Sequence, residues 1–180
     1  MNLPYSKNVI LNVMNLKHSL GKTAIMKITY MLQQIKKIDL GYSFEIYTYG
    51  PYTAEVTEDI NDLIQSGLIH SSMYNYSNYI GYELKLSKKG KDSLNTLNTK
   101  EILNINEIID FIEGKNAKNL ELSSTIVFIN GLYLKNKLPY NQDVIINKVH
   151  EIKPHFEIDS IRDSYNELKE RKYLNVDRKR

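Results

Sequence analysis

The segment Gly21-Lys22-Thr23 matches the end of a phosphate-binding loop, in which backbone N–H groups and a lysine hold the phosphates of a nucleotide. The complete pattern requires a glycine five positions before Gly21, where this chain has Leu16. It also requires a preceding strand, whereas the residues before Gly21 have the apolar spacing of a helix. We therefore interpret Gly21-Lys22-Thr23 as the start of a helix and not as a nucleotide site.

Residues that bind metals are few in this chain and far apart. Cysteine is absent, which excludes thiolate metal sites, disulfides and a cysteine nucleophile. The four histidines are His18, His70, His150 and His155. No two of them have the spacing that places a ligand pair on one helix face, so a metal site would require convergence in the folded protein. We expect neither a metal ion nor another cofactor.

One dense group of carboxylates is present, and it lies within a single predicted helix. Its members are Glu55, Glu58, Asp59 and Asp62. The apolar spacing of that helix turns these side chains outward into water, whereas a catalytic pair is partly buried so that its pKa values are tuned. No nucleophile stands beside a recognisable base either. The sequence therefore predicts that the protein is not an enzyme.

The first half of the chain divides into helices, a short strand and a hairpin. Apolar residues at three- and four-residue spacing predict helices over 5–18, 22–37 and 53–66, the second stopped at Gly41 and the third at Gly67. Alternation predicts a short strand over 42–47, followed by a tight turn at Gly50-Pro51. Two apolar runs, 68–74 and 79–86, predict a hairpin, and Ser87 then caps a short helix.

The second half is predicted to be all helical. Its helices are expected over 101–113, 120–135, 141–153 and 159–171. The best boundary between two units falls at 95–99. We therefore expect an α+β protein, with a winged helix-turn-helix domain over 1–98 whose wing is the hairpin, followed by an all-helical C-terminal unit over 99–180.

An apolar pattern occurs once in each half at the same spacing. The two sets are Val56, Ile60, Leu63, Leu68 and Ile69, and Ile161, Tyr165, Leu168, Tyr173 and Leu174. One interpretation is that the second unit is a degenerate winged-helix half that has lost its wing. The other is a chance match, because any amphipathic helix followed by two apolar residues would fit the pattern.

The third helix carries the wrong charge for reading DNA. In a DNA-binding winged helix, this helix enters the major groove, where Arg, Lys, Asn and Gln read the bases. Here it has four acids and no Lys or Arg, so phosphates would repel it. Only Asn61 and Gln65 remain as readers of base edges. Insertion of this helix into a groove is therefore not expected.

Basic and aromatic side chains gather near the predicted wing. Four lysines lie at the end of its second strand and at the start of the next helix: Lys85, Lys88, Lys89 and Lys91. They could contact a DNA backbone, although runs of charge usually face only water. Tyrosines are frequent from Tyr42 to Tyr82, and exposed ones such as Tyr76 and Tyr79 at the wing would suit a protein interface. Most of the others are expected to pack within the core.

Composition leaves the partner open. The chain has 180 residues and a formal net charge of +3, a mild excess that neither establishes nor excludes nucleic-acid binding. No segment approaches the ~20 apolar residues of a membrane span. The first residues lack the pattern of a signal peptide. We expect a cytoplasmic protein with no membrane partner.

The run from Gly21 to Ile69 resembles the YwgA-like proteins of bacteria and archaea. The matching positions are Lys27, Ile28, Tyr30, Met31, Leu32, Phe44, Tyr47, Tyr49, Gly50, Pro51, Tyr52, Thr53, Gly67, Leu68 and Ile69. The resemblance covers about residues 20–95, and the later Lys153-Pro154-His155-Phe156 segment is compatible with it. More distantly, the helix and Tyr-Gly-Pro segment resemble the Panacea domain found in antitoxins. The resemblance implies a winged-helix fold without catalysis.

Two functions follow from these observations. The first is a non-enzymatic regulator or adaptor of antitoxin or defence-regulator type, which binds a protein with a basic surface through Glu55, Glu58, Asp59, Asp62, Tyr76 and Tyr79. The alternative is a transcriptional regulator, acting as a homodimer, that contacts DNA through Lys85, Lys88, Lys89 and Lys91, with Asn61 and Gln65 as base readers.

Overall fold

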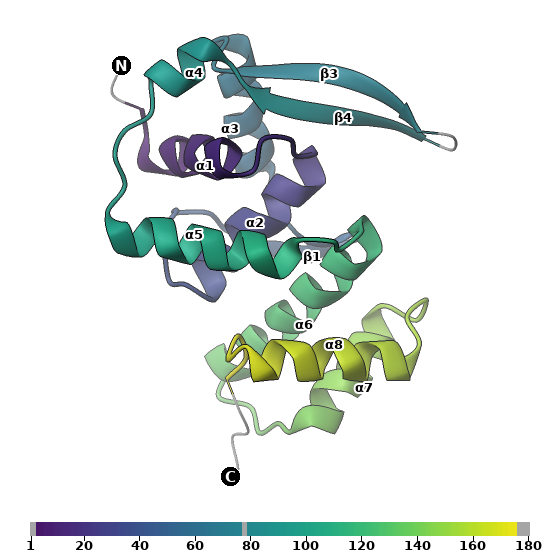
Figure 1. The fold of residues 1–180 in the computed structure, drawn as a ribbon. Helices are drawn as coiled ribbons and strands as arrows, with labels where there is room; N and C mark the ends of the chain where they lie inside the picture. Colours follow the sequence, from purple (N-terminus) through teal and green to yellow (C-terminus); the bar gives the residue numbers. More distant parts are fainter. Residues whose placement is uncertain (1–2, 77–78, 176–180) are drawn as a thin grey trace. The chain divides into compact units, whose positions relative to one another are not determined.

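The computed structural model describes residues 3–76 and 79–175, and for residues 74–80 it describes no side chains. The chain forms two compact units (Figure 1). Unit 1 contains residues 1–44 and 53–114, and unit 2 contains residues 45–52 and 115–180. Both helices and antiparallel strands are present, so the protein is α+β, as predicted. No helix in the described part of the chain is long and apolar enough to cross a membrane.

Unit 1 contains the helices on both sides of residues 45–52, a segment that belongs to unit 2. Its elements are α1 (Tyr5–Leu16), α2 (Lys22–Gln34), α3 (Ala54–Gln65), β3 (Ile69–Tyr76), β4 (Tyr79–Leu86), α4 (Lys88–Asp92) and α5 (Thr99–Ile112). The β3–β4 hairpin projects from the helices and pairs Ile69 with Leu86 at its base (Figure 1). A single bridge joins Leu20, between α1 and α2, to Leu84 of β4. This bridge fixes the base of the hairpin to the helical core.

The ends of α3 are set by the residues that the sequence indicates. Thr53 caps the helix, with its side chain accepting a hydrogen bond from the backbone N–H of Glu55. Gly67 (φ 71°) adopts the left-handed conformation that ends it. The predicted end of α2 was wrong, because the helix ends at Gln34, with Ile35 as its C-cap, and does not reach Lys37. Lys37 (φ 56°) and Gly41 (φ 76°) are both left-handed in the segment that follows.

The predicted turn at Gly50-Pro51 was also wrong. These residues lie in β2 (Gly50–Tyr52), which pairs with β1 (Glu45–Tyr47) so that Ile46 is opposite Pro51. Gly50 has φ 84°, and a Cβ there would stand 3.1 Å from both Ser124 Oγ and Thr125 Oγ1. Glycine is needed at this position for its backbone conformation and for the close approach of the strand to a helix.

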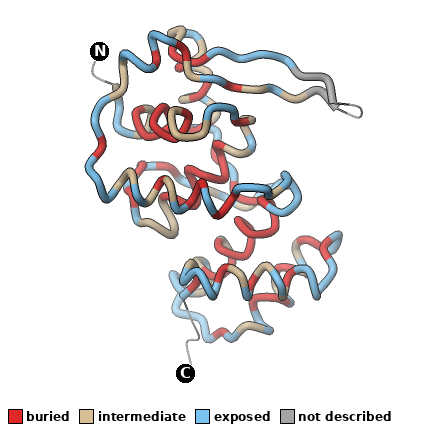
Figure 2. The backbone as a smooth tube through the Cα atoms, in the orientation of Figure 1, coloured by how far each residue is buried: buried red, intermediate tan, exposed pale blue. Residues whose placement is uncertain are grey.

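Unit 2 is built around one helix that is buried on most of its circumference. Its helices are α6 (Ala117–Lys135), α7 (Gln142–Ile152) and α8 (Ile158–Glu170). α6 packs against α7, α8 and β2. Its residues 120–127 are all buried, and Figure 2 shows this stretch in red. The described part of 115–180 is helical, as predicted, but the unit also takes in the β1–β2 hairpin. No pattern in the sequence indicated that residues 45–52 belong with this unit.

The structure divides the chain at a different place from the expected 95–99 boundary. Helix α5 belongs to unit 1, where it packs against α1 and α2. Ile105 and Ile108 of α5 are fully buried there. The ion pairs Lys17–Glu113, at 2.9 Å, and Lys36–Glu107 also hold it. The division between the units therefore follows Gly114, where the apolar face of α5 ends.

The apolar pattern shared by the two halves is present in three dimensions. Its residues, in α3 and α8 or just after them and 105 positions apart, are buried except for Tyr173, which is half-buried. Each helix is followed by a residue with positive φ, Gly67 (71°) or Lys172 (60°). The next backbone N–H then donates back into the helix at 2.9 Å, from Leu68 to Leu63 and from Tyr173 to Leu168. The two helices thus end in the same geometry.

Candidate functional site

The acidic residues of α3 contact other parts of unit 1. Asp59 Oδ2 accepts hydrogen bonds from the hydroxyl groups of Tyr42, at 2.6 Å, and Ser6, at 2.9 Å. Lys7 lies 2.7 Å from Asp62 and 3.6 Å from Asp59. The hydrogen bond to Asp62 raises the pKa of Lys7, against the opposing effect of burial. These two carboxylates therefore fix α3 to α1 and to the segment before β1.

The two other acids of α3 differ from each other. Glu55 accepts hydrogen bonds from the backbone N–H of Ser43, at 2.9 Å, and from the hydroxyl of Thr53, at 3.0 Å. Glu58 is exposed and has no ion pair among the residues that the structure describes. The sequence placed all four acids on one helix, but its prediction that they face water was wrong for Asp59, whose side chain is 18% exposed and accepts a hydrogen bond from Tyr42. The sequence could not show that a chain segment 12 to 17 residues earlier binds to this helix.

Tyr42→Phe should lower the stability of unit 1 by about 1–2 kcal/mol at pH 8, because it removes a hydrogen bond to a charged carboxylate. Burial, and then the hydrogen bond to Asp59, raise the pKa of Tyr42 above its usual range. The folded state therefore keeps this proton where the unfolded state loses it, so the contribution is complete below pH ~10 and falls as the pH rises further. Denaturation in urea from pH 8 to 11 measures the effect.

The difference between wild type and the Tyr42→Phe variant isolates this hydroxyl. Burial also raises the pKa of Tyr30 and of Tyr5, so the stability of both proteins should fall in alkali. The wild type should fall more steeply, and the gap between the two should narrow above pH ~10. If the difference in unfolding free energy between the two proteins is constant from pH 8 to 11, the hydroxyl proton of Tyr42 does not contribute as proposed.

The proposed DNA-contacting residues of unit 1 are partly engaged in the fold. Asn61 Oδ1 accepts a hydrogen bond from Lys22 at 3.0 Å, while Gln65 is exposed. Lys85 lies 2.9 Å from Glu83, and Lys89 donates to the carbonyl of Ser66 at 2.8 Å. The remaining lysines of this group, Lys88 and Lys91, are exposed.

Exposed tyrosines occur on both hairpins. The side chains of Tyr76 and Tyr79 lie outside the described residues, although their backbones pair at the ends of β3 and β4. On the described part of that hairpin, Met73 is 69% exposed and Tyr82 is 51% exposed. The expectation that most of the other tyrosines pack within the core was wrong for Tyr47, Tyr49 and Tyr52, which are 67%, 69% and 40% exposed.

A buried lysine in unit 2, Lys153, connects the β1–β2 hairpin to helix α6. Lys153 and Glu121 are nearly buried, and Lys153 Nζ lies 2.9 Å from Oε1 of Glu121, without the alignment of a hydrogen bond. The same Nζ donates to the carbonyl oxygens of Tyr47, at 3.0 Å, and of Thr48. Lys153 therefore anchors the turn of the β1–β2 hairpin to α6, and we name this arrangement the lysine anchor.

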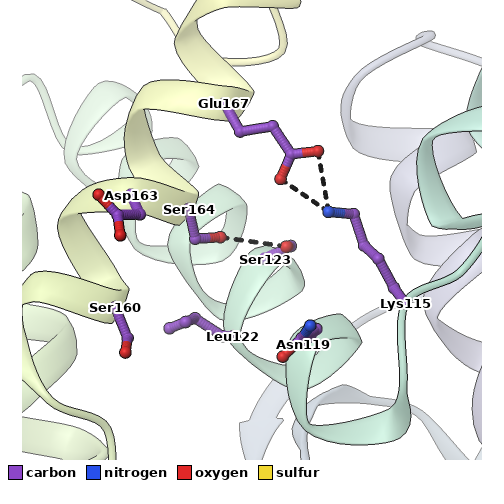
Figure 3. Close-up of a pocket in the computed structure, with 8 residues that line it drawn as sticks. All are labelled: Lys115, Asn119, Leu122, Ser123, Ser160, Asp163, Ser164 and Glu167. Atoms are coloured by element: carbon purple, nitrogen blue, oxygen red, sulfur yellow. Dashed lines mark hydrogen bonds and ion pairs between the residues drawn. The ribbon is translucent and has the colours of Figure 1, made fainter.

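Sequence reasoning did not find a polar cleft between α6 and α8, which we name the α8 cleft. It has a volume of about 290 Å³ and is lined by Lys115, Asn119, Leu122, Ser123, Ser160, Asp163, Ser164 and Glu167 (Figure 3). Lys115 Nζ bonds both carboxylate oxygens of Glu167, at 2.8 and 2.7 Å. The hydroxyl groups of Ser123 and Ser164 are hydrogen-bonded to each other at 3.1 Å.

The α8 cleft does not have the arrangement of an acid–base or nucleophilic centre. Neither serine of the hydrogen-bonded pair has a histidine or lysine as its hydrogen-bond partner in the described part of the chain. Among the described residues, no group of three histidine or carboxylate side chains converges to hold a metal ion. The cleft instead presents hydroxyl, amide and carboxylate groups that can hydrogen-bond a ligand.

Comparison with known proteins gives one informative match. No model of a protein family matches the chain. The chain is 25% identical to the uncharacterized protein YwgA of Bacillus subtilis (strain 168) over 113 residues, which are 63% of this chain and 67% of YwgA. The aligned length exceeds the segment of about 20–95 on which the resemblance was based. The protein is therefore a distant relative of YwgA.

Proposed function

We propose that the protein is a non-enzymatic winged-helix regulator or adaptor, of the antitoxin or defence-regulator type, that binds a protein partner through unit 1. The order of its elements supports the winged-helix assignment. α1 is followed by the bridge of Leu20 to Leu84, then by α2, α3 and the β3–β4 hairpin. In this assignment the hairpin is the wing and α3 is the helix that a DNA-binding member would place in the groove.

The charge of α3 is the observation that carries the proposal. Its exposed positions include Glu55, Glu58, Asp62 and Gln65, and the helix has no basic residue. Lys7 offsets part of the negative charge of Asp59 and Asp62, but the exposed Glu58 remains. A DNA phosphate would be repelled by this face, whereas a basic protein surface would be attracted to it.

The β3–β4 hairpin adds exposed apolar area to unit 1. Met73 and Tyr82 are exposed on it, and methionine and aromatic residues are enriched at protein interfaces. Lys22 lies over the ring of Tyr82, with its Nζ 5.7 Å from the ring centroid, which fixes one face of that ring. We propose Glu58, Met73 and Tyr82 as the centre of the partner surface, together with Tyr76 and Tyr79.

The test uses a variant that leaves the structural acids in place. Glu58→Lys combined with Tyr82→Ala should reduce partner recovery at least tenfold in quantitative affinity purification, and the loss should be reproduced with the purified partner. Asp92→Lys, an exposed acid of α4, makes a matched charge change and should have no effect. Equal recovery of the partner by wild type and by the Glu58→Lys, Tyr82→Ala variant would reject this surface.

The exposed lysines of α4 favour one alternative, a DNA-binding regulator that acts as a homodimer. Lys88, Lys89 and Lys91 lie together on a short helix after the hairpin, close in sequence to Lys85. Such contacts predict a steep loss of duplex affinity between 50 and 200 mM salt, measured by fluorescence anisotropy. Absence of binding at low salt would remove this alternative.

A further inference from the structure

The polar face of α8 repeats the acidic face of α3 position by position. At the same offset of 105 residues, Glu55, Glu58, Asp59 and Asp62 correspond to Ser160, Asp163, Ser164 and Glu167. All four residues of α8 line the α8 cleft. The two helices bury the same apolar positions and end in the same geometry, so these polar residues occupy equivalent places on equivalent helices.

In unit 1, the chain itself covers this face. The segment before β1 places the hydroxyl of Tyr42 on Asp59, at 2.6 Å, and the backbone N–H of Ser43 on Glu55, at 2.9 Å. A lysine of α1, Lys7, pairs with Asp62 at 2.7 Å. A tyrosine in an extended segment is thus the group that this helix face holds in unit 1.

In unit 2, side-chain contacts to α8 like those to α3 are present, but no described segment of the unit covers the polar face of α8. Lys115 pairs with Glu167 as Lys7 pairs with Asp62, and Ser123 contacts Ser164 as Ser6 contacts Asp59. The connection from α7 to α8 is only residues 153–157, whereas α2 and α3 are joined by residues 35–53. The short connection leaves the polar face of α8 open as the α8 cleft (Figure 3).

We propose that the α8 cleft binds an extended segment of a partner protein that carries a tyrosine. Its phenol hydroxyl would hydrogen-bond at Ser164, the equivalent of Asp59, and its backbone N–H at Ser160, the equivalent of Glu55. Leu122, at the side of the cleft on α6, provides an apolar contact for the ring. This site is in unit 2 and does not depend on the proposed function of unit 1.

The charge of the cleft selects among such segments. Lys115 is neutralised by its two hydrogen bonds to Glu167, and the carboxylate of Asp163 adds a net negative charge. A neutral or basic segment is therefore accepted. A phosphotyrosine is rejected, because its phosphate carries a charge of about −1.5 to −2 at pH 7 and would lie beside a carboxylate.

The chain supplies its own probe for the test, the amidated peptide Leu40–Phe44, which carries Tyr42 and a net charge of +1. A short untethered peptide loses the advantage of covalent linkage, so a Kd of roughly 0.1–1 mM is expected. Titration into ¹⁵N-labelled full-length protein should shift backbone amides of 119–123 and 160–167. The Tyr42→Phe peptide should bind several-fold more weakly, and the phosphotyrosine peptide at least tenfold more weakly.

Two protein variants complete the experiment. Ser160→Trp places a large ring at the exposed edge of the cleft and should abolish the shifts, whereas Lys169→Trp, exposed on another face of α8, should leave them unchanged. Shifts confined to α3, which would mean that the peptide only displaces its own copy in unit 1, would overturn the proposal. So would equal binding of the phosphorylated peptide, or no shift in wild type at 5 mM peptide.

Discussion

Replacing Lys153 with methionine should destabilise unit 2 by about 3–5 kcal/mol, the usual cost of removing one partner from a buried ion pair. The carboxylate of Glu121 would stay nearly buried, with Nε2 of the half-exposed His155 ring 3.5 Å from its Oε1. The carbonyl oxygens of Tyr47 and Thr48 would lose their shared donor as well. Hydrogen exchange of the α6 amides measures the free energy of unfolding of this unit directly.

Two further variants test whether the unpaired carboxylate of Glu121 causes the loss of stability. Adding Glu121→Gln to Lys153→Met should recover at least ~1 kcal/mol, because the double variant no longer buries an unpaired carboxylate. Lys135→Met replaces an exposed lysine of α6 and should cost less than ~0.5 kcal/mol. If Lys153→Met costs no more than Lys135→Met, the lysine anchor contributes nothing to stability.

Gly90→Ala should cost about 3 kcal/mol of stability in unit 1, although alanine is the better helix former by about 1 kcal/mol. A Cβ on Gly90 would stand 2.2 Å from the carbonyl oxygen of Leu68 and 2.7 Å from Cδ1 of Leu86. Because the nearer atom belongs to the backbone, α4 would have to move away from Leu68, in the segment between α3 and β3. Urea denaturation followed by circular dichroism measures the loss.

The surrounding contacts explain why α4 cannot simply shift. Ser87 Oγ donates to the carbonyl of Gly67 at 2.7 Å and accepts from the N–H of Gly90 at 2.9 Å. Gly21→Ala is the matched control, since a Cβ there meets only the carbonyl oxygen of Tyr82, at 3.5 Å. It should cost less than ~1 kcal/mol. A Gly90→Ala protein as stable as wild type would show that propensity outweighs the contact.

The local elements of the fold were largely predictable, because their signals are local. The apolar spacing of α3, its cap at Thr53 and its stop at Gly67 all act within a few residues. The same holds for the β3–β4 hairpin. Gly50-Pro51 was misinterpreted because Gly50 is needed for close contact with Ser124 and Thr125, more than 70 positions away, as well as for its own backbone conformation. A turn pattern cannot indicate that a strand needs glycine to approach a distant helix.

In the candidate sites, too, the sequence did not reveal contacts between residues that are far apart in the chain. The acids of α3 were identified from their spacing, but the hydroxyl of Tyr42 and the ammonium of Lys7 that bind them come from other elements. The α8 cleft was missed because Ser160 and Asp163 are ordinary residues on a polar helix face. The repeated apolar pattern was the one signal that could have led there, since it aligns these residues with the acids of α3.

Unit 2 takes its hairpin from residues 45–52, so the chain passes between the units at 44/45, 52/53 and 114/115. During synthesis on the ribosome, this hairpin emerges long before α6, and its ordering must await the rest of unit 2. A fragment that starts at Lys115 would hold Lys153 without the two carbonyl groups that it binds. We expect a separate peptide of residues 45–52 to supply these carbonyl groups and to stabilise the fragment by complementation.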